Sequence, residues 1–115
     1  RGVGVLVHLL SDEAHQIRSA AAGALMLITT VEQGKDDMLA TDGPAVIVDL
    51  LTDDQRLVKL NCLKVISSIA AHPEIREIYQ KDQNCLERLG TLEKSDDELL
   101  SKHAAVAKQV VLWAP

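Results

Sequence analysis

The segment 7–13, with the sequence Val-His-Leu-Leu-Ser-Asp-Glu, recurs 41 residues later as segment 48–54, with the sequence Val-Asp-Leu-Leu-Thr-Asp-Asp. The match continues beyond each copy, since Ile17 of the first unit corresponds to Val58 of the second. A third copy follows when one residue is inserted near Ser95. A period of about 40 residues is typical of repeat proteins, in which each unit stacks on its neighbours.

Within each unit the apolar residues have the spacing of one face of an α-helix, three or four residues apart. We expect these residues to be buried between helices. They are Ile17, Ala21, Ala24, Leu25 and Ile28 in the first unit, Val58, Cys62, Val65, Ile66 and Ile69 in the second, and Leu100, Ala104, Ala107 and Val111 in the third. Lys108 takes the place of Ile66, which predicts a more polar outer face for the last unit.

The sequence predicts six to eight helices joined by short loops, because helix-favouring residues dominate and the alternation of a strand is absent. The expected helices cover residues 3–10, 14–31, 35–41, 44–51, 55–71, 73–81, 84–93 and 97–113. Gly34 is expected to follow the first long helix, Pro44 to lie at a helix start, and Pro73 to follow the end of the second long helix. The candidate N-caps of the three long helices are Asp12, Asp53 or Asp54, and Ser95 or Asp96.

The composition predicts an aliphatic core and excludes several kinds of partner. Only 2% of the residues are aromatic, and 12 basic residues against 17 acidic ones give a net charge of −5. Binding of nucleic acid or of an anionic membrane needs clustered cations, so we expect neither partner. Two cysteines are too few for a disulfide scaffold and indicate a reducing compartment such as the cytoplasm. We expect the chain, which begins with Arg1, to be a fragment.

Two segments resemble the armadillo repeat. Residues 43–51 are similar to its Gly-x-x-x-x-Leu-Val-x-Leu-Leu opening, and residues 17–25 to its Ala-x-x-Ala-Leu centre. The resemblance implies an all-α fold, a right-handed alpha-alpha superhelix of about two and a half to three repeats. The chain 1–115 would then be a single armadillo-repeat fragment, with copies at approximately 1–34, 35–72 and 73–115.

Three further segments resemble the C-terminal end of the radial-spoke-head armadillo family, which is also named after the rhabdoid tumour deletion region. They are residues 21–26 followed by 32–35, residues 59–64 and residues 110–115. This resemblance implies a non-enzymatic scaffold of the ciliary axoneme, with axonemal or radial-spoke proteins as partners. The alternative is a soluble armadillo adaptor that binds a partner peptide in its concave groove outside cilia.

The armadillo resemblance implies that the long helices line a concave groove that binds proteins. The candidate protein-binding residues are Leu27, Lys64, Ser68, Lys102, Val106, Val110 and Trp113. Further positions expected to face the groove are Ser19, Gly23, Thr30, Leu60 and Ala71. The lysines either meet an acidic partner segment or form a solvated helix face. Trp113 either anchors a partner or covers the last edge of the core.

Armadillo proteins that bind basic peptides carry a ladder of Trp and Asn residues in this groove, and that ladder is missing here. Its tryptophan positions are occupied by Gly23, Lys64 and Val106, and its asparagine positions by Leu27, Ser68 and Val110. We therefore do not expect cargo of the nuclear-import type.

No residue pattern points to catalysis, a cofactor or a metal. The four histidines do not have the sequence spacing of metal ligands, and His15 is the one nearest to other residues that could bind a metal. The sequence contains no glycine-rich phosphate loop. Cys62 is expected to be a core residue. Cys85 is expected near a helix N-terminus, a place that can lower a thiol pKa, but nothing pairs with it and we interpret both cysteines as structural. Gly23 is expected to allow close packing of a neighbouring helix, with access for a ligand as the alternative. Exposed terminal repeats would also allow two copies of the fragment to pair.

Overall fold

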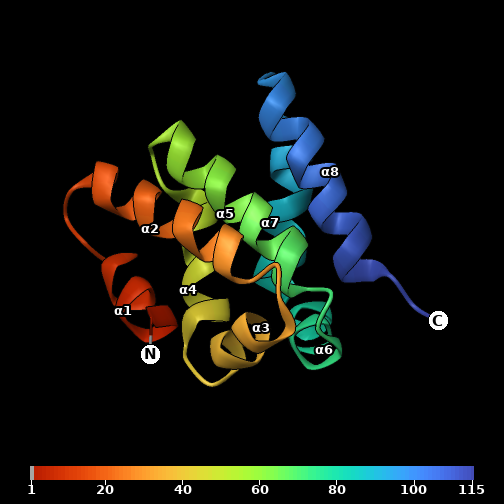
Figure 1. Ribbon diagram of the computed structural model, residues 1–115. Coiled ribbons are helices and arrows are strands. Elements are labelled where there is room, and N and C mark those ends of the chain that lie inside the picture. Colours follow the sequence, from red (N-terminus) through yellow and green to blue (C-terminus); the bar gives the residue numbers. More distant parts are fainter. Residues whose placement is uncertain (1) are drawn as a thin grey trace.

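The computed structural model describes residues 2–115, and in this range all the regular secondary structure is helical (Figure 1). The elements are α1 (Gly2–Leu9), α2 (His15–Ile28), α3 (Glu32–Leu39), α4 (Gly43–Asp49), the 3-10 helix η1 (Leu50–Thr52), α5 (Arg56–Ile69), α6 (Pro73–Lys81), α7 (Gln83–Glu93) and α8 (Glu98–Leu112). The predicted helices therefore exist, with bounds that differ by a few residues.

The long helices α2, α5 and α8 follow one another across the molecule, and α5 packs against both of the others (Figure 1). The shorter helices pack against this row, with contacts of α1 on α2, of α4 on α5, and of α6 and α7 on α8. The molecule measures 36 × 35 × 21 Å. Its smallest dimension matches two layers of helices, each about 10 Å thick.

The helices repeat in the order short, medium, long. One such set is α3, α4 and α5, and the next is α6, α7 and α8, while α1 and α2 form a medium and long pair before them. Tyr79 ties the two complete sets together, because its buried hydroxyl donates a hydrogen bond to the Pro44 carbonyl oxygen at 2.7 Å.

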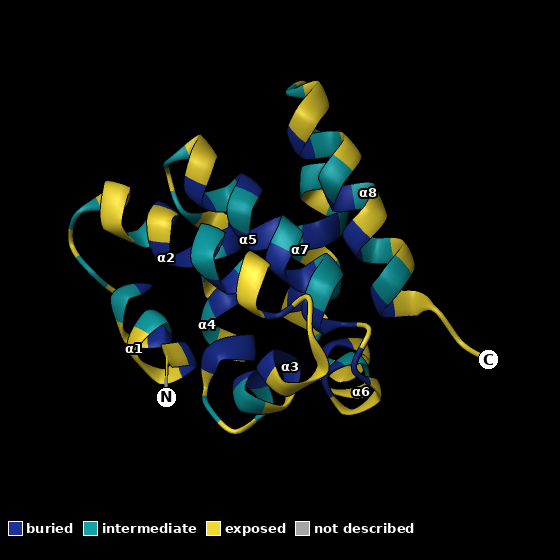
Figure 2. Cartoon of the chain, in the orientation of Figure 1, coloured by how far each residue is buried: buried dark blue, intermediate teal, exposed yellow. Residues whose placement is uncertain are grey.

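The predicted core residues of the second and third units are buried, which confirms the helical spacing (Figure 2). Val58, Cys62, Val65, Ile66 and Ile69 of α5 are fully buried, because α5 has a long helix on each side. Leu100, Ala104, Ala107 and Val111 of α8 are buried as well.

The prediction was wrong for part of the first unit. Ala21 and Leu25 are buried, but Ala24 is only half-buried, and Ile17 and Ile28 are 41% and 38% exposed. In α5 the equivalent residues pack against the preceding long helix. Among residues 2–115 no long helix precedes α2, so this side of α2 faces solvent.

Gly34 lies inside α3, rather than in a turn after the first long helix as predicted. A Cβ atom at this position would lie 2.2 Å from the Ile28 carbonyl oxygen. The backbone φ of Gly34 is not positive, so the residue provides space instead of a turn conformation. It lets the start of α3 approach the end of α2.

The predicted caps lie slightly outside the long helices. The N-cap residues of α2 and α5 are Ala14 and Gln55, and Asp12 and Asp53 instead accept hydrogen bonds from these two backbone N–H groups, each at 2.9 Å. This is the turn that an Asp side chain makes with the backbone two residues later. In α8 the N-cap is Asp97, whose carboxylate accepts from two N–H groups of the first turn.

Two arginines join successive units through these aspartates. Arg18 of α2 binds Asp53, with 2.9 Å between Nε and Oδ2, and Arg56 of α5 pairs with Asp97. Burial raises the pKa of Asp53, but the hydrogen bonds from Arg18 and the Gln55 N–H lower it by a larger amount. The pKa of Asp53 is therefore below its usual value. The Arg56 hydrogen bond lowers the pKa of Asp97 to about 2.

Candidate protein-binding groove

The three long helices present equivalent residues on the side that faces away from the shorter helices. We call this surface the groove face. Its first four rows, each taken from α2, α5 and α8 in turn, are Gln16, Leu57 and Leu99; Ala20, Asn61 and His103; Gly23, Lys64 and Val106; and Leu27, Ser68 and Val110. The last row, Thr30, Ala71 and Trp113, lies just past the ends of the three helices. Every one of these residues is exposed or half-buried, so the face is accessible along its whole length.

The structure places the seven candidate binding residues at accessible positions. Leu27, Lys102, Val106 and Trp113 are exposed, and Lys64, Ser68 and Val110 are half-buried. Lys102 is equivalent in register to Leu60 rather than to a member of the groove face. That these residues bind a partner stays a prediction.

The prediction that Ser19 and Leu60 face the groove was wrong, because both are buried between the long helices. Ser19 lies under Asn61, whose Nδ2 donates to the Ser19 carbonyl oxygen at 3.0 Å and to its Oγ at 3.2 Å. Ser68 makes a similar link, since its Oγ donates to the Thr29 carbonyl oxygen at 2.9 Å. A polar seam therefore joins α2 to α5 beneath the groove face.

Between α2 and α5 the groove face contains a hollow of about 430 Å³ that is lined in part by Ala20, Gly23, Leu57 and Asn61. A Cβ atom on Gly23 would lie 3.6 Å from Asn61 Nδ2, which is an ordinary contact distance. Close helix packing therefore does not require this glycine, contrary to the prediction. Its lack of a side chain keeps the hollow open.

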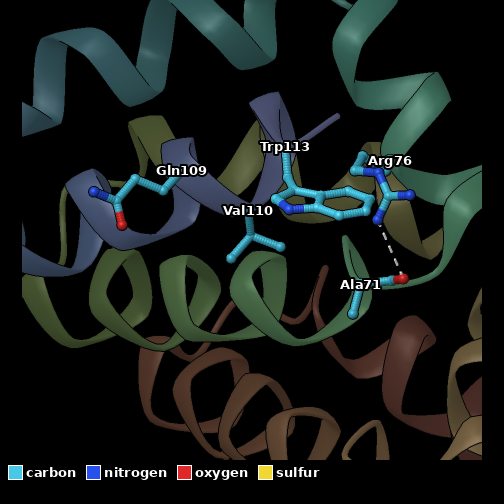
Figure 3. Close-up of a pocket in the computed structure, with 5 residues that line it drawn as sticks. All are labelled: Ala71, Arg76, Gln109, Val110 and Trp113. Carbon is cyan, nitrogen blue, oxygen red and sulfur yellow. Dashed lines mark hydrogen bonds between the residues drawn. The ribbon is translucent and has the colours of Figure 1, made fainter. Parts of the chain in front are cut away.

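A second hollow, of about 530 Å³, lies between the end of α5 and the end of α8 (Figure 3). Its lining residues are Ala71, Arg76, Gln109, Val110 and Trp113. The Arg76 Cζ atom lies 4.8 Å from the centre of the Trp113 ring, within the range of a cation–π contact. The indole is 53% exposed and lies beside Arg76, so it does not cover the edge of the core.

Helix α6 holds this second hollow in place. Arg76 donates from Nη1 to the carbonyl oxygens of Ala70 and Ala71, both at 3.4 Å. Gln80, one turn later, donates from Nε2 to the carbonyl oxygens of Val111 at 2.8 Å and Trp113 at 3.3 Å. The end of α8 and the indole are thus fixed by side chains from a different helix.

The half of the groove face formed by α5 and α8 carries the cation Lys64, although the chain as a whole carries a charge of −5. Burial and then the charges of Lys64 and Lys102 lower the pKa of His103, so this imidazole is mostly neutral at neutral pH. No groove-face residue of α5 or α8 is acidic, and Arg76 adds a further positive charge at the end of the face.

The two cysteines are buried, as expected for Cys62. Burial raises the pKa of each thiol to about 12. For Cys85 the loss of hydration outweighs the lowering that a helix start favours, which agrees with a structural role. These thiols therefore remain protonated at neutral pH.

His15 is exposed at the start of α2. Within residues 2–115 no three His, Cys, Asp or Glu side chains are grouped so that they could hold a metal ion. Over the same part of the chain, no helix has both the length and the apolar character needed to cross a bilayer.

Arg76 and Gln80 were not predicted as site residues. The predicted binding positions all belong to the long helices or their ends, whereas these two residues belong to the short helix α6. No repeat spacing connects α6 to the end of α8, so only the folded structure brings Arg76 beside Trp113.

No protein-family model matches the chain, and no curated protein matches it. Solved structures do resemble it. An engineered protein from the Northeast Structural Genomics Consortium is 27% identical, with a TM-score of 0.86 over 93% of this chain and 44% of its own. A second engineered protein from the same consortium is 24% identical, with a TM-score of 0.90 over 98% of this chain and 28% of its own.

A third similar structure is that of computationally designed armadillo repeat proteins for modular peptide recognition. It is 24% identical, with a TM-score of 0.83 over 91% of this chain and 44% of its own. The chain therefore has the fold of an α-solenoid of the armadillo type, as predicted. It spans less than half the length of each of these three proteins.

Proposed function

We propose that this chain is a protein-binding scaffold and that its groove face takes an extended segment of a partner protein. The observation that carries the proposal is the groove face itself, with accessible side chains in register on three parallel helices. Such stacked helices supply a long, rigid surface, and rigid surfaces bind without a large cost of ordering. The designed protein of the same fold is described as made for peptide recognition, which is consistent with this role.

The charge of the groove face indicates the kind of segment it takes. Lys64 and His103 lie on adjacent helices, and no carboxylate occupies a groove-face position beside them. The half-buried Val110 and the exposed Val106 supply apolar surface on the same face as Lys64. A partner segment that is acidic and contains apolar side chains therefore fits this half of the face best.

The test is a charge reversal in the groove and its matched control elsewhere. The variant Lys64→Glu should weaken capture of partner proteins by at least tenfold, because it places a carboxylate among the groups that attract the segment. Lys81→Glu on α6 is the control, since Lys81 is exposed and lies outside the groove face. Equal capture by both variants, with both folded by circular dichroism, would contradict a binding role for the groove.

We further propose the axoneme of motile cilia as the setting, with radial-spoke proteins as partners. The support for this setting is the resemblance of residues 21–26, 59–64 and 110–115 to the radial-spoke-head armadillo family. A tagged form of the full protein should then label the axoneme along its length in ciliated cells. A signal restricted to the cell body would favour the alternative of a soluble cytoplasmic adaptor.

We also propose that two copies of the chain pair through the exposed side of α2. Ile17, Ala24 and Ile28 form this side, and the exposed Val31 follows just past the end of the helix. An antiparallel pairing about Ala24 places the start of α2 in one copy beside the end of α2 in the other. The same surface patch then serves both copies, as a two-fold interface requires.

Sedimentation equilibrium tests this pairing. The chain should sediment as a dimer at micromolar concentration, and Ala24→Glu should make it a monomer because two carboxylates would meet on the axis. Ala105→Glu, on the opposite end of the array, should leave the dimer intact. A monomeric wild-type chain would rule out the pairing without affecting the groove.

A further inference from the structure

The hollow at the end of α5 and α8 combines an aromatic ring, an aliphatic wall and a guanidinium group. Figure 3 shows the Trp113 ring and Val110 bordering the same space, with Arg76 beside the ring and Gln109 turned to the other side. The volume of about 530 Å³ is within the range of pockets that bind small ligands, roughly 300–1,000 Å³. The site is therefore large enough for a bulky side chain and the polar group next to it.

The guanidinium is held in place and still has donors for a ligand. Among the described residues, both of its hydrogen bonds use Nη1, which donates to the carbonyl oxygens of Ala70 and Ala71. Its Nε and Nη2 edge is left for an outside group. A planar pair of N–H donors fits the two oxygens of a carboxylate and favours it over a neutral acceptor.

Building on the proposed function, we propose that this hollow is the anchoring subsite of the groove. It takes an aromatic or large aliphatic side chain against Trp113 and Val110, with a neighbouring carboxylate of the same peptide on Arg76. The flat indole offers a stacking surface, and its partial exposure leaves apolar area for a ligand to cover. The recognised unit is thus an apolar residue adjacent to an acidic one.

The position of the hollow supports this choice of ligand. Trp113 and Ala71 form the last row of the groove face, so a peptide that lies along Lys64 and Ser68 of α5 reaches the hollow directly. A basic peptide would bring its charges against Arg76 and Lys64. The same positive groups therefore select acidic segments along the groove and at its end.

Trp113 provides a direct signal for binding, because it is the only tryptophan in the chain. Its indole N–H gives one resolved peak in a proton–nitrogen correlation spectrum. The probe is 3-phenylpropionate, which carries a ring and a carboxylate, and the matched control is 3-phenylpropanamide, which has the same ring without the charge. A ligand of this size is expected to bind with a dissociation constant of roughly millimolar.

The expected result is a saturable shift of the indole peak with 3-phenylpropionate and a shift at least fivefold weaker with the amide. Arg76→Gln should reduce the affinity for the carboxylate to that for the amide. Lys81→Gln removes an exposed positive charge from the same helix and should leave the affinity unchanged. Circular dichroism of each variant establishes that α6 is still folded.

The absence of an indole shift at about 20 mM probe, well above a millimolar dissociation constant, would overturn the subsite. Equal affinities for the carboxylate and the amide would overturn the role of Arg76. A stronger shift with 3-phenylpropylamine, which is positively charged, would show that the hollow selects cations and would refute the proposal. None of these results bears on capture through Lys64, so failure of the subsite and failure of the groove can be distinguished.

Discussion

Truncation of two isoleucines at equivalent positions tests the packing of the array in one experiment. Ile28 in α2 and Ile69 in α5 are 41 positions apart and each ends its long helix. Ile69 is fully buried, whereas Ile28 is 38% exposed because no long helix precedes α2 among the described residues. The same change, Ile→Ala, therefore removes the same atoms from two different environments.

The expected costs follow from the exposed fractions. Removing three carbons from a fully buried site loses about 2.4 kcal/mol of transfer free energy at ~0.8 kcal/mol per methylene group. The cavity left behind brings the cost of Ile69→Ala to about 3–4 kcal/mol. About three fifths of Ile28 is buried, which gives about 1.5 kcal/mol, with little cavity at the surface. The two variants should therefore differ by about 2 kcal/mol.

The assay is urea unfolding followed by circular dichroism at 222 nm, with thermal unfolding as a second measure. A difference of about 2 kcal/mol corresponds to a separation of roughly 8 °C or more between the midpoints. Equal destabilisation by the two variants would mean that the outer side of α2 is covered as completely as that of α5, which is opposite to the structure.

Three other perturbations have expected outcomes of known sign. Gly90→Ala should stabilise the chain by about 0.5–1 kcal/mol in urea unfolding, because a Cβ atom at this position meets no atom within 4 Å. Gly34→Ala should destabilise the chain, because the new Cβ atom would collide with backbone atoms. A stabilising Gly34→Ala together with a destabilising Gly90→Ala would be inconsistent with the structure. The pKa of Asp97 is lowered from 3.8 to about 2, so its contribution to stability is complete above about pH 4 and disappears as the pH falls through 2. Asp97→Asn should therefore be less stable than the wild type at pH 7 and equally stable near pH 2 in acid titrations followed by circular dichroism, and a constant gap across this range would contradict the Arg56 pairing. Both thiols, with pKa values of about 12 and no exposure, should react with a disulfide reagent only after unfolding, so rapid labelling of Cys62 or Cys85 in native buffer would count against their buried positions.

The repeat and the helical spacing were predictable from the sequence because they are local. The period of 41 residues places Val58 and Val65 on the same face as their counterparts, and the structure buries both. The exposure of Ile17 was not predictable from its own spacing. A helix face in a solenoid is buried only when a neighbouring unit lies on it, and the spacing within one helix does not contain that information.

The candidate site was predictable only in part, for a similar reason. The position of Val106 on the groove face follows from the helical period, whereas Trp113 lies just past the end of α8 in extended backbone. The pairing of Trp113 with Arg76 depends on how α6 packs against α8, and no motif in either segment signals it. Cys85 shows a second limit, because its place near a helix start suggested a low pKa and its burial gives the opposite.

Site-specific photo-crosslinking tests the central claim, that the groove face is the binding surface, most directly. A photoreactive amino acid placed at Val106 lies on the groove face, and one placed at Ile78 lies on α6, away from that face. The two side chains are similarly exposed, at 41% and 48%, so access to solvent does not distinguish them. We expect partner proteins to crosslink to position 106 and not to position 78. Crosslinking at position 78 with none at position 106 would contradict the central claim.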